Sequence, residues 1–139
     1  MKNLGQTCLL LDVDGVLHGP LTWRPGLEQF IAWAWSTFDL VCLLTRRQAT
    51  IYKDWPGPKT GCGPCPPSLA WEDNKTEPLP GISRAGYRLF WAEDGVLQGE
   101  EVWCRKHPMT HYMNCRGAEN LAEVKRRILR MMADVRQGG

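Results

Sequence analysis

The most constraining feature of this sequence is an uninterrupted apolar run, Cys8 to Leu11, that leads directly into Asp12-Val-Asp14-Gly15. A continuous run of this kind is typical of a strand buried on both faces, as in a parallel sheet with helices on either side. The two acids then fall where the strand ends, and Gly15 allows a sharp bend after them. Because open α/β sheets bind ligands at the carboxyl ends of their strands, we expect this stretch to form part of a site.

Two carboxylates at a strand end have two interpretations. Asp12 and Asp14 can hold a hard divalent cation and still leave one oxygen free to react. Asp and Gly are also ordinary turn residues, so the same pattern fits a solvated turn. The segment from Leu9 to Leu17 resembles the first motif of the haloacid dehalogenase (HAD) superfamily of aspartate-nucleophile phosphohydrolases, and this favours the first interpretation.

The rest of the chain continues the strand and helix alternation of an α/β fold. A helix is expected over 25–37, a second buried strand over 38–44, a third strand over 87–92, an edge strand over 111–115 and an amphipathic helix over 118–135. A short helix is expected over 48–55, and the Pro/Gly-rich segment 56–67 reads as a loop insertion. The sequence therefore predicts a three-layer Rossmann-like domain with a mostly parallel central sheet flanked by helices.

Length and composition are those of one globular domain. The chain has 139 residues, 43% hydrophobic and 23% charged, and a net charge of +2, which is too small to indicate nucleic-acid binding by itself. Its apolar runs are too short for a membrane span, and the short stretch before the first strand leads us to expect no signal peptide. We therefore expect a single domain over 1–139 that is cytoplasmic and does not bind membranes. The sequence leaves its oligomeric state open.

The HAD resemblance assigns further residues by their order along the chain. Thr45, at the end of the second strand, resembles the second motif, and with Arg46 it would bind the phosphoryl group. Thr45 before Arg46-Arg-Gln-Ala is also a fair helix cap. Lys75 resembles the third motif, although a lone Lys is usually a solvated charge and Arg84 or Arg88 are substitutes for it.

The third strand ends in the acidic pair Glu93-Asp94, which resembles the fourth motif. By this resemblance Mg²⁺ would bind Asp12, the backbone carbonyl of Asp14, and Asp94, while Glu93 would orient Asp94 or a metal-bound water. Asp12 would attack phosphorus, and Asp14 would serve as general acid and then general base. Lys75 would neutralise charge between the carboxylates and the phosphoryl oxygens.

Cysteine and histidine residues offer a separate candidate site. Cys62-Gly-Pro-Cys65 lies inside a Pro/Gly loop, which argues against a thioredoxin-like redox role. A structural zinc is the alternative, because CxxC with two further Cys or His ligands is a common zinc pattern. The downstream donors are Cys104, His107, His111 and Cys115. The remaining interpretation is free cysteines and surface histidines, and Cys8 and Cys42 are expected in the core.

The intervals between the expected motifs leave no room for a cap domain, so the resemblance is to the small, capless HAD domains linked to RNA repair and to phage-type phosphatases. It implies a Mg²⁺-dependent phosphatase acting on nucleotides or nucleic-acid phosphate ends. Trp23, Trp55 and Trp71 could stack on a base, or could simply be packing residues. The alternatives are a non-catalytic scaffold module held by the Cys/His zinc, and phosphotransfer to an acceptor other than water.

Overall fold

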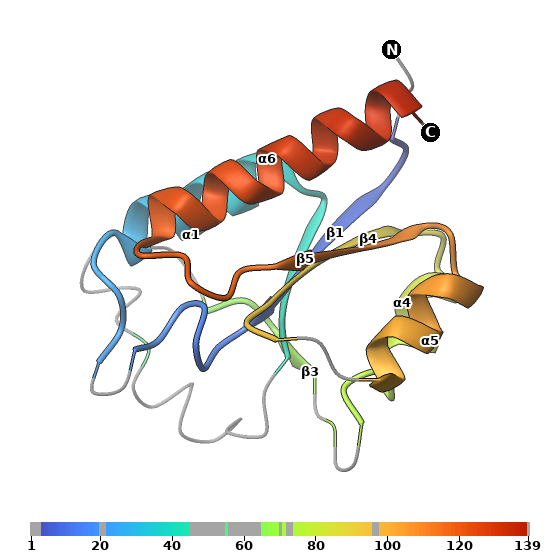
Figure 1. The fold of residues 1–139 in the computed structure, drawn as a ribbon, viewed down its shortest axis with the longest axis horizontal. Coiled ribbons are helices and arrows are strands. Elements are labelled where there is room, and N and C mark those ends of the chain that lie inside the picture. Colours follow the sequence, from blue (N-terminus) through green and yellow to red (C-terminus); the bar gives the residue numbers. More distant parts are fainter. Residues whose placement is uncertain are drawn as a thin grey trace.

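A five-stranded sheet forms the centre of the protein in a computed structural model, and helices cover both of its faces (Figure 1). The structure describes residues 4–19, 22–44, 55, 65–69, 71, 74–95 and 98–138. The strands are β1 (Thr7–Asp12), β2 (Leu40–Leu44), β3 (Ser68–Leu69), β4 (Arg88–Glu93) and β5 (Thr110–Asn114). The helices are α1 (Leu27–Thr37), α4 (Leu79–Arg84), α5 (Gln98–Lys106) and α6 (Leu121–Gly138). The α/β prediction is confirmed.

The order of the strands creates a switch point beside β1. All neighbouring strands are parallel, in the order β3-β2-β1-β4-β5. The chain first builds outward from β1 to β3, and then returns to place β4 on the other side of β1. Ligands of such sheets bind where the direction of winding reverses, outside the carboxyl ends of the strands. The pairing of Leu11 with Ala92 brings the ends of β1 and β4 together at this point.

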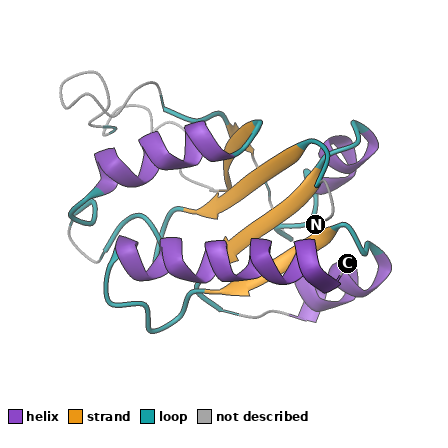
Figure 2. Cartoon of the chain, turned by 90° about the horizontal axis from the view of Figure 1, so that it is seen from above, coloured by secondary structure: helices purple, strands orange, loops and turns teal. Residues whose placement is uncertain are grey.

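Alternate side chains of the strands supply two separate hydrophobic layers. Leu9 and Leu11 of β1 pack with α1 and α6 on one face, whereas Cys8 and Leu10 pack with Leu79 of α4 on the other. Trp103 of α5 packs against this second layer. Figures 1 and 2 show the resulting arrangement, with α1 and α6 lying side by side over the sheet and α4 and α5 on its opposite face.

Several element boundaries differ slightly from the predicted ones because side chains cap or redirect the chain. β2 begins at Leu40 because Asp39 turns back to β1, where its Oδ2 accepts a hydrogen bond of 2.8 Å from the backbone N–H of Thr7. α6 begins at Leu121 because Asn120 Oδ1 caps the N–H of Glu123 at 2.9 Å. β4 runs one residue further than predicted and includes Glu93.

Three elements were not predicted. β3 has two residues, which is too short for a periodic signal. α4 begins with Leu-Pro-Gly, a poor helix-forming sequence. α5 carries acids in its first turn and bases in its last, and this charge order was the available signal for a helix. The expected edge strand is present as β5, which is the outermost strand beyond β4.

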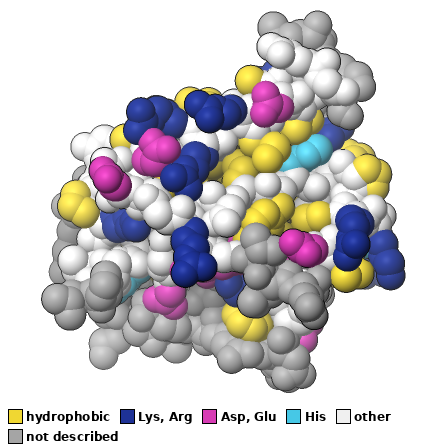
Figure 3. Space-filling model, in the orientation of Figure 1, with side chains coloured by type: hydrophobic (Ala, Val, Ile, Leu, Met, Phe, Trp, Pro, Cys, Tyr) yellow, Lys and Arg dark blue, Asp and Glu magenta, His cyan; other side chains and the backbone are white. Residues whose placement is uncertain are grey.

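None of the helices within the described ranges combines the length and the apolarity needed to span a bilayer. On the face seen in Figure 3, basic side chains are interspersed with acidic ones and do not form one continuous patch. The five described cysteines are free thiols, and Cys8 and Cys42 are buried in the core as expected.

Candidate functional site

Three carboxylates meet at the switch point. Asp12 ends β1, Glu93 ends β4, and Asp94 follows Glu93 directly. One oxygen of each lies within 4.8 Å of the others, and these are the only three described His, Cys, Asp or Glu residues so grouped. Asp12 and Glu93 are buried, with exposures of 7% and 3%, whereas Asp94 is exposed. Two carboxylates of the cluster are therefore buried, and the third is in contact with solvent.

Lys75 supplies the positive charge of the site. Its Nζ donates a hydrogen bond of 2.6 Å to Glu93 Oε1 and lies 3.5 Å from Asp12 Oδ2. All three side chains are at most 12% exposed, so solvent screens the interaction weakly. Three carboxylates with one ammonium still leave two negative charges uncompensated when all are ionised.

A capped turn positions Lys75. Asn74 Oδ1 accepts hydrogen bonds from the backbone N–H and the hydroxyl of Thr76, at 2.9 and 2.8 Å, and this fixes the turn that leads into α4. The ring of Trp71 lies 5.6 Å from Lys75 Nζ, a cation–π distance. Neither Asn74 nor Trp71 was predicted to support Lys75, although Asn two residues before Thr is a recognisable turn signal.

Asp94 is held against the turn that follows β1. Gly15 has a φ of +87°, and a Cβ added there would lie 2.1 Å from Asp94 Oδ2. Both the backbone conformation and the close contact therefore require glycine at this position. Hydrogen bonds from the N–H groups of Leu17 and His18 to Val13 O close the turn, and Val13 and Leu17 are buried. The sequence indicated the bend at Gly15 but not its contact with Asp94.

Burial and close carboxylates shift the pKa values of two residues in the cluster. Burial raises the pKa of Asp12 to about 9, and the adjacent Glu93 carboxyl adds to this rise while Lys75 opposes it. Burial lowers the pKa of Lys75, but its hydrogen bond to Glu93 and the three nearby carboxylates outweigh that effect and raise it overall. Glu93 Oε2 is buried, and no hydrogen-bond partner for it is found among the residues that the structure describes. A hard cation would supply that partner and stabilise the ionised form of Asp12.

No protein-family model, curated protein or solved structure matches this chain. The chemistry of the site therefore rests on the position of its own residues. Asp12, Glu93, Asp94 and Lys75 come from three separate segments of the chain, and the fold brings all four together.

The sequence suggested other residues for a phosphate site besides the acidic cluster and Lys75. Asp14 is exposed in the turn two residues beyond Asp12. Thr45 and Arg46 follow the end of β2 in the sequence but lie outside the described residues. Arg84 and Arg88, the substitutes considered for Lys75, are engaged elsewhere: Arg84 Nε donates to Pro80 O, and Arg88 Nη1 lies 2.8 Å from His111 Nε2.

The expectation of a zinc site does not hold for the described members of the set. Cys104 belongs to α5, and the ring of His107 just beyond it stacks on Trp103, on one side of the sheet. His111 instead contacts Phe90, and Cys115 is buried in the core, on the side covered by α1 and α6. The sheet thus separates these donors; Cys65 is half-buried against the α1 and α6 layer, and Cys62 lies outside the described residues.

The tryptophans considered as base-stacking residues have structural contacts. Trp23 and Trp55 meet edge to face at 5.2 Å, and Trp55 is buried in the core. Trp71 lies beside Lys75 as described above. Packing therefore accounts for Trp55, and the sequence alone did not distinguish this role from base stacking.

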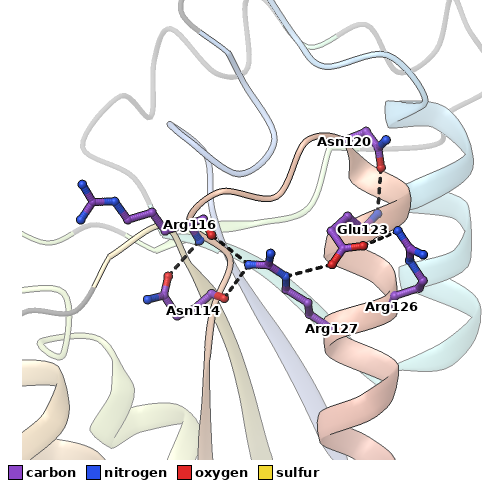
Figure 4. A network of polar contacts seen from close by, with 6 residues as sticks. All are labelled: Asn114, Arg116, Asn120, Glu123, Arg126 and Arg127. Atoms are coloured by element: carbon purple, nitrogen blue, oxygen red, sulfur yellow. Dashed lines mark hydrogen bonds and ion pairs between the residues drawn. The ribbon is translucent and has the colours of Figure 1, made fainter.

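A polar network fixes the edge of the sheet next to the acids (Figure 4). In the sheet register, Glu93 of β4 lies opposite Asn114 of β5. Arg127 of α6 donates hydrogen bonds from Nη1 to the carbonyl oxygens of Asn114 and Arg116, at 3.1 and 3.0 Å. Arg127 Nε also donates to Glu123 Oε1 at 3.2 Å. Arg127 therefore ties the end of β5 to α6.

Proposed function

We propose that this protein is a Mg²⁺-dependent phosphatase that uses Asp12 as its nucleophile on phosphate monoesters, with nucleotides or nucleic-acid phosphate ends as substrates. The observation that carries the proposal is the convergence of three carboxylates with Lys75 at the switch point of a parallel sheet. This arrangement agrees with the HAD-like order of motifs in the sequence. It is also the place where a fold of this type binds its ligand.

The donor set fits magnesium. Asp12, Glu93 and Asp94 offer hard oxygen ligands, and the unpartnered Oε2 of Glu93 needs a positive neighbour. When bound, the ion would lower the negative charge that otherwise repels a phosphate dianion. The exposed position of Asp94 leaves the outer side of the cluster open to a substrate.

The chain's own residues account for the transfer of the phosphoryl group. An oxygen of Asp12 forms a bond to phosphorus while the bond to the leaving oxygen breaks, and Asp14 gives that oxygen a proton. Asp14 then removes a proton from water, which attacks the aspartyl-phosphate and releases inorganic phosphate with Asp12 restored. Lys75 compensates the charge between Asp12 and the phosphoryl oxygens throughout.

Turnover of p-nitrophenyl phosphate with and without Mg²⁺ tests this proposal. We expect Mg²⁺-dependent release of phosphate that falls about 10³-fold or more in Asp12→Asn, because the amide is a far poorer nucleophile. Asp134→Asn, an exposed change of the same chemistry on α6, serves as the matched control. Acid-quenched wild-type protein should carry covalent phosphate. Equal rates for wild type and Asp12→Asn would overturn the proposal.

A further inference from the structure

A cavity of about 420 Å³ lies between α5 and the edge strand β5. Tyr112 of β5 is opposite Trp91 in the sheet register, and their rings meet edge to face at 5.8 Å. Because side chains alternate along a strand, Tyr112 and Trp91 share with Glu93 the face covered by α4 and α5. The cavity therefore lies on the same face of the sheet as the acidic cluster. Its lining residues are Glu100, Glu101, Cys104, Arg105 and Tyr112.

Two polar groups of this cavity are buried without a partner. Glu100 is only 2% exposed, and none of the described residues donates a hydrogen bond to its Oε2. The hydroxyl of Tyr112 is likewise buried and has no partner within the described part of the chain. An acid in the first turn is favoured by the helix dipole of α5, but the dipole supplies no donor to Oε2. Such groups are costly to bury alone, and a ligand that bonds to them removes that cost.

The charges of the lining residues indicate which chemical groups of a ligand the cavity can bind. Glu100 and Glu101 face a single cation, Arg105, and the described residues form no ion pair between Arg105 and either glutamate. Burial, followed by the charges of Glu93, Glu100 and Asp94, raises the pKa of Tyr112. The cavity is therefore a negative environment whose buried acceptor requires a donor. An N–H group meets that requirement, whereas a second anion does not.

We propose that this cavity holds the part of the substrate beyond the phosphate, and that Glu100 selects leaving groups that present an N–H donor. The proposal rests on the phosphatase function proposed above. The volume of the cavity is sufficient for a nucleobase or for an alkylamine. Both carry N–H donors on an otherwise weakly polar body, and Tyr112 offers a second hydrogen bond to either.

Matched pairs of phosphate esters distinguish the two sources of the N–H group. Adenosine and purine riboside 5′-monophosphates differ only in the exocyclic amino group of the base, which is the sole N–H of that pair, and 4-aminobutyl and pentyl phosphates differ in an ammonium against a methyl group. We expect kcat/KM to favour the N–H member of one pair by about 10-fold or more, since a charge-assisted hydrogen bond to a buried carboxylate is strong. The favoured pair identifies the substrate class.

Variants of Glu100 test its role. Glu100→Met, which keeps a side chain of similar length without the acceptor, should abolish the discrimination, and Glu119→Met, at an exposed position outside the cavity, should retain it. Glu100→Leu provides a second variant without an acceptor if Glu100→Met does not fold. Discrimination that survives in either folded variant would overturn the proposal.

Calorimetric binding of adenosine, purine riboside, 4-aminobutanol and pentanol to the full chain separates this proposal from the proposed function. If no ester releases phosphate but adenosine or 4-aminobutanol binds through Glu100, the cavity assignment stands and the phosphatase proposal fails. If phosphate is released equally from both members of each pair, and the unphosphorylated compounds bind alike, the phosphatase proposal stands and the cavity assignment is overturned.

Discussion

Asp12 is the carboxyl group of the site whose pKa is raised by its surroundings. Its pKa is raised to about 9 by burial and by the Glu93 carboxyl, against an ordinary value of 3.8. The folded protein therefore keeps a proton on Asp12 that the unfolded chain releases. The stability of the metal-free protein must accordingly fall as the pH rises between these two values, since the unfolded state binds fewer protons throughout that range.

Asp12→Asn removes this titration while keeping the shape of the side chain. In EDTA near pH 8 we expect the variant to be more stable than wild type by about 1–3 kcal/mol, with little difference near pH 4. Urea unfolding at both pH values measures the effect. Excess Mg²⁺ should narrow the gap at pH 8 because it binds the ionised carboxylate of wild type. A variant less stable than wild type at pH 8 in EDTA would contradict this account.

Gly15 controls the position of Asp94. In Gly15→Ala the new Cβ would lie 2.1 Å from Asp94 Oδ2, so the carboxylate must leave its present position in the cluster with Asp12 and Glu93. We expect the affinity for Mg²⁺, measured by calorimetry, to fall roughly 10-fold or more. Gly5→Ala is the matched control, because Gly5 also has a positive φ of 69° but meets nothing within 4 Å. Both variants should lose stability, but only Gly15→Ala should lose the ion.

Elements with strong local patterns were predictable from the sequence, and those defined by tertiary contacts were not. The apolar runs of β1 and β2 and the amphipathic face of α6 each carry a signal over a single stretch of chain. β3 exists only because Leu43 and Leu44 pair with it. The same contrast holds for the site: its acids follow predictable strands, but the contact between Gly15 and Asp94 joins distant segments.

The described donors of the expected zinc site lie apart for a similar reason. Spacing along the chain placed Cys104 and His107 close to His111 and Cys115, but a turn after α5 sends the chain into β5, whose side chains alternate between the two faces of the sheet. Donors near in sequence were thereby assigned to opposite layers. Sequence spacing predicts a metal site only when the elements that carry the donors are also known.

At the scale of elements, Arg127 joins α6 to the end of β5. Arg127→Met loses the hydrogen bonds to the carbonyls of Asn114 and Arg116, so we expect a loss of about 1–3 kcal/mol in the free energy of unfolding. Arg126→Met is the control: this side chain is 72% exposed and its one ion pair among the described residues is with Glu123, so the loss should stay within about 0.5 kcal/mol. Denaturant unfolding measures both.

Hydrogen exchange locates the effect of Arg127. The amide of Cys115 donates to the carbonyl of Glu93, and we expect its protection to fall in Arg127→Met more than the protection of amides in β1. Uniform loss of protection across the sheet would mean that Arg127 acts on global stability alone and not on the edge that carries Glu93.

At the scale of the whole molecule, the site depends on one long-range pairing. Asp12 and Glu93 become neighbours only through the pairing of β1 with β4, whose residues, such as Cys8 and Leu89, are far apart in sequence. Lys75 comes from the stretch between β3 and β4 and reaches the acids from the side of α4. The site is thus a product of the complete sheet and of no single segment.

The central position of β1 also has a consequence during synthesis. β2 emerges from the ribosome soon after β1 and can cover one of its edges, but the other edge stays exposed until β4 has been made. For that interval β1, with its run of four apolar residues from Cys8 to Leu11, presents unsatisfied backbone groups along one edge, so we expect a chain that stops before β4 to be prone to aggregation.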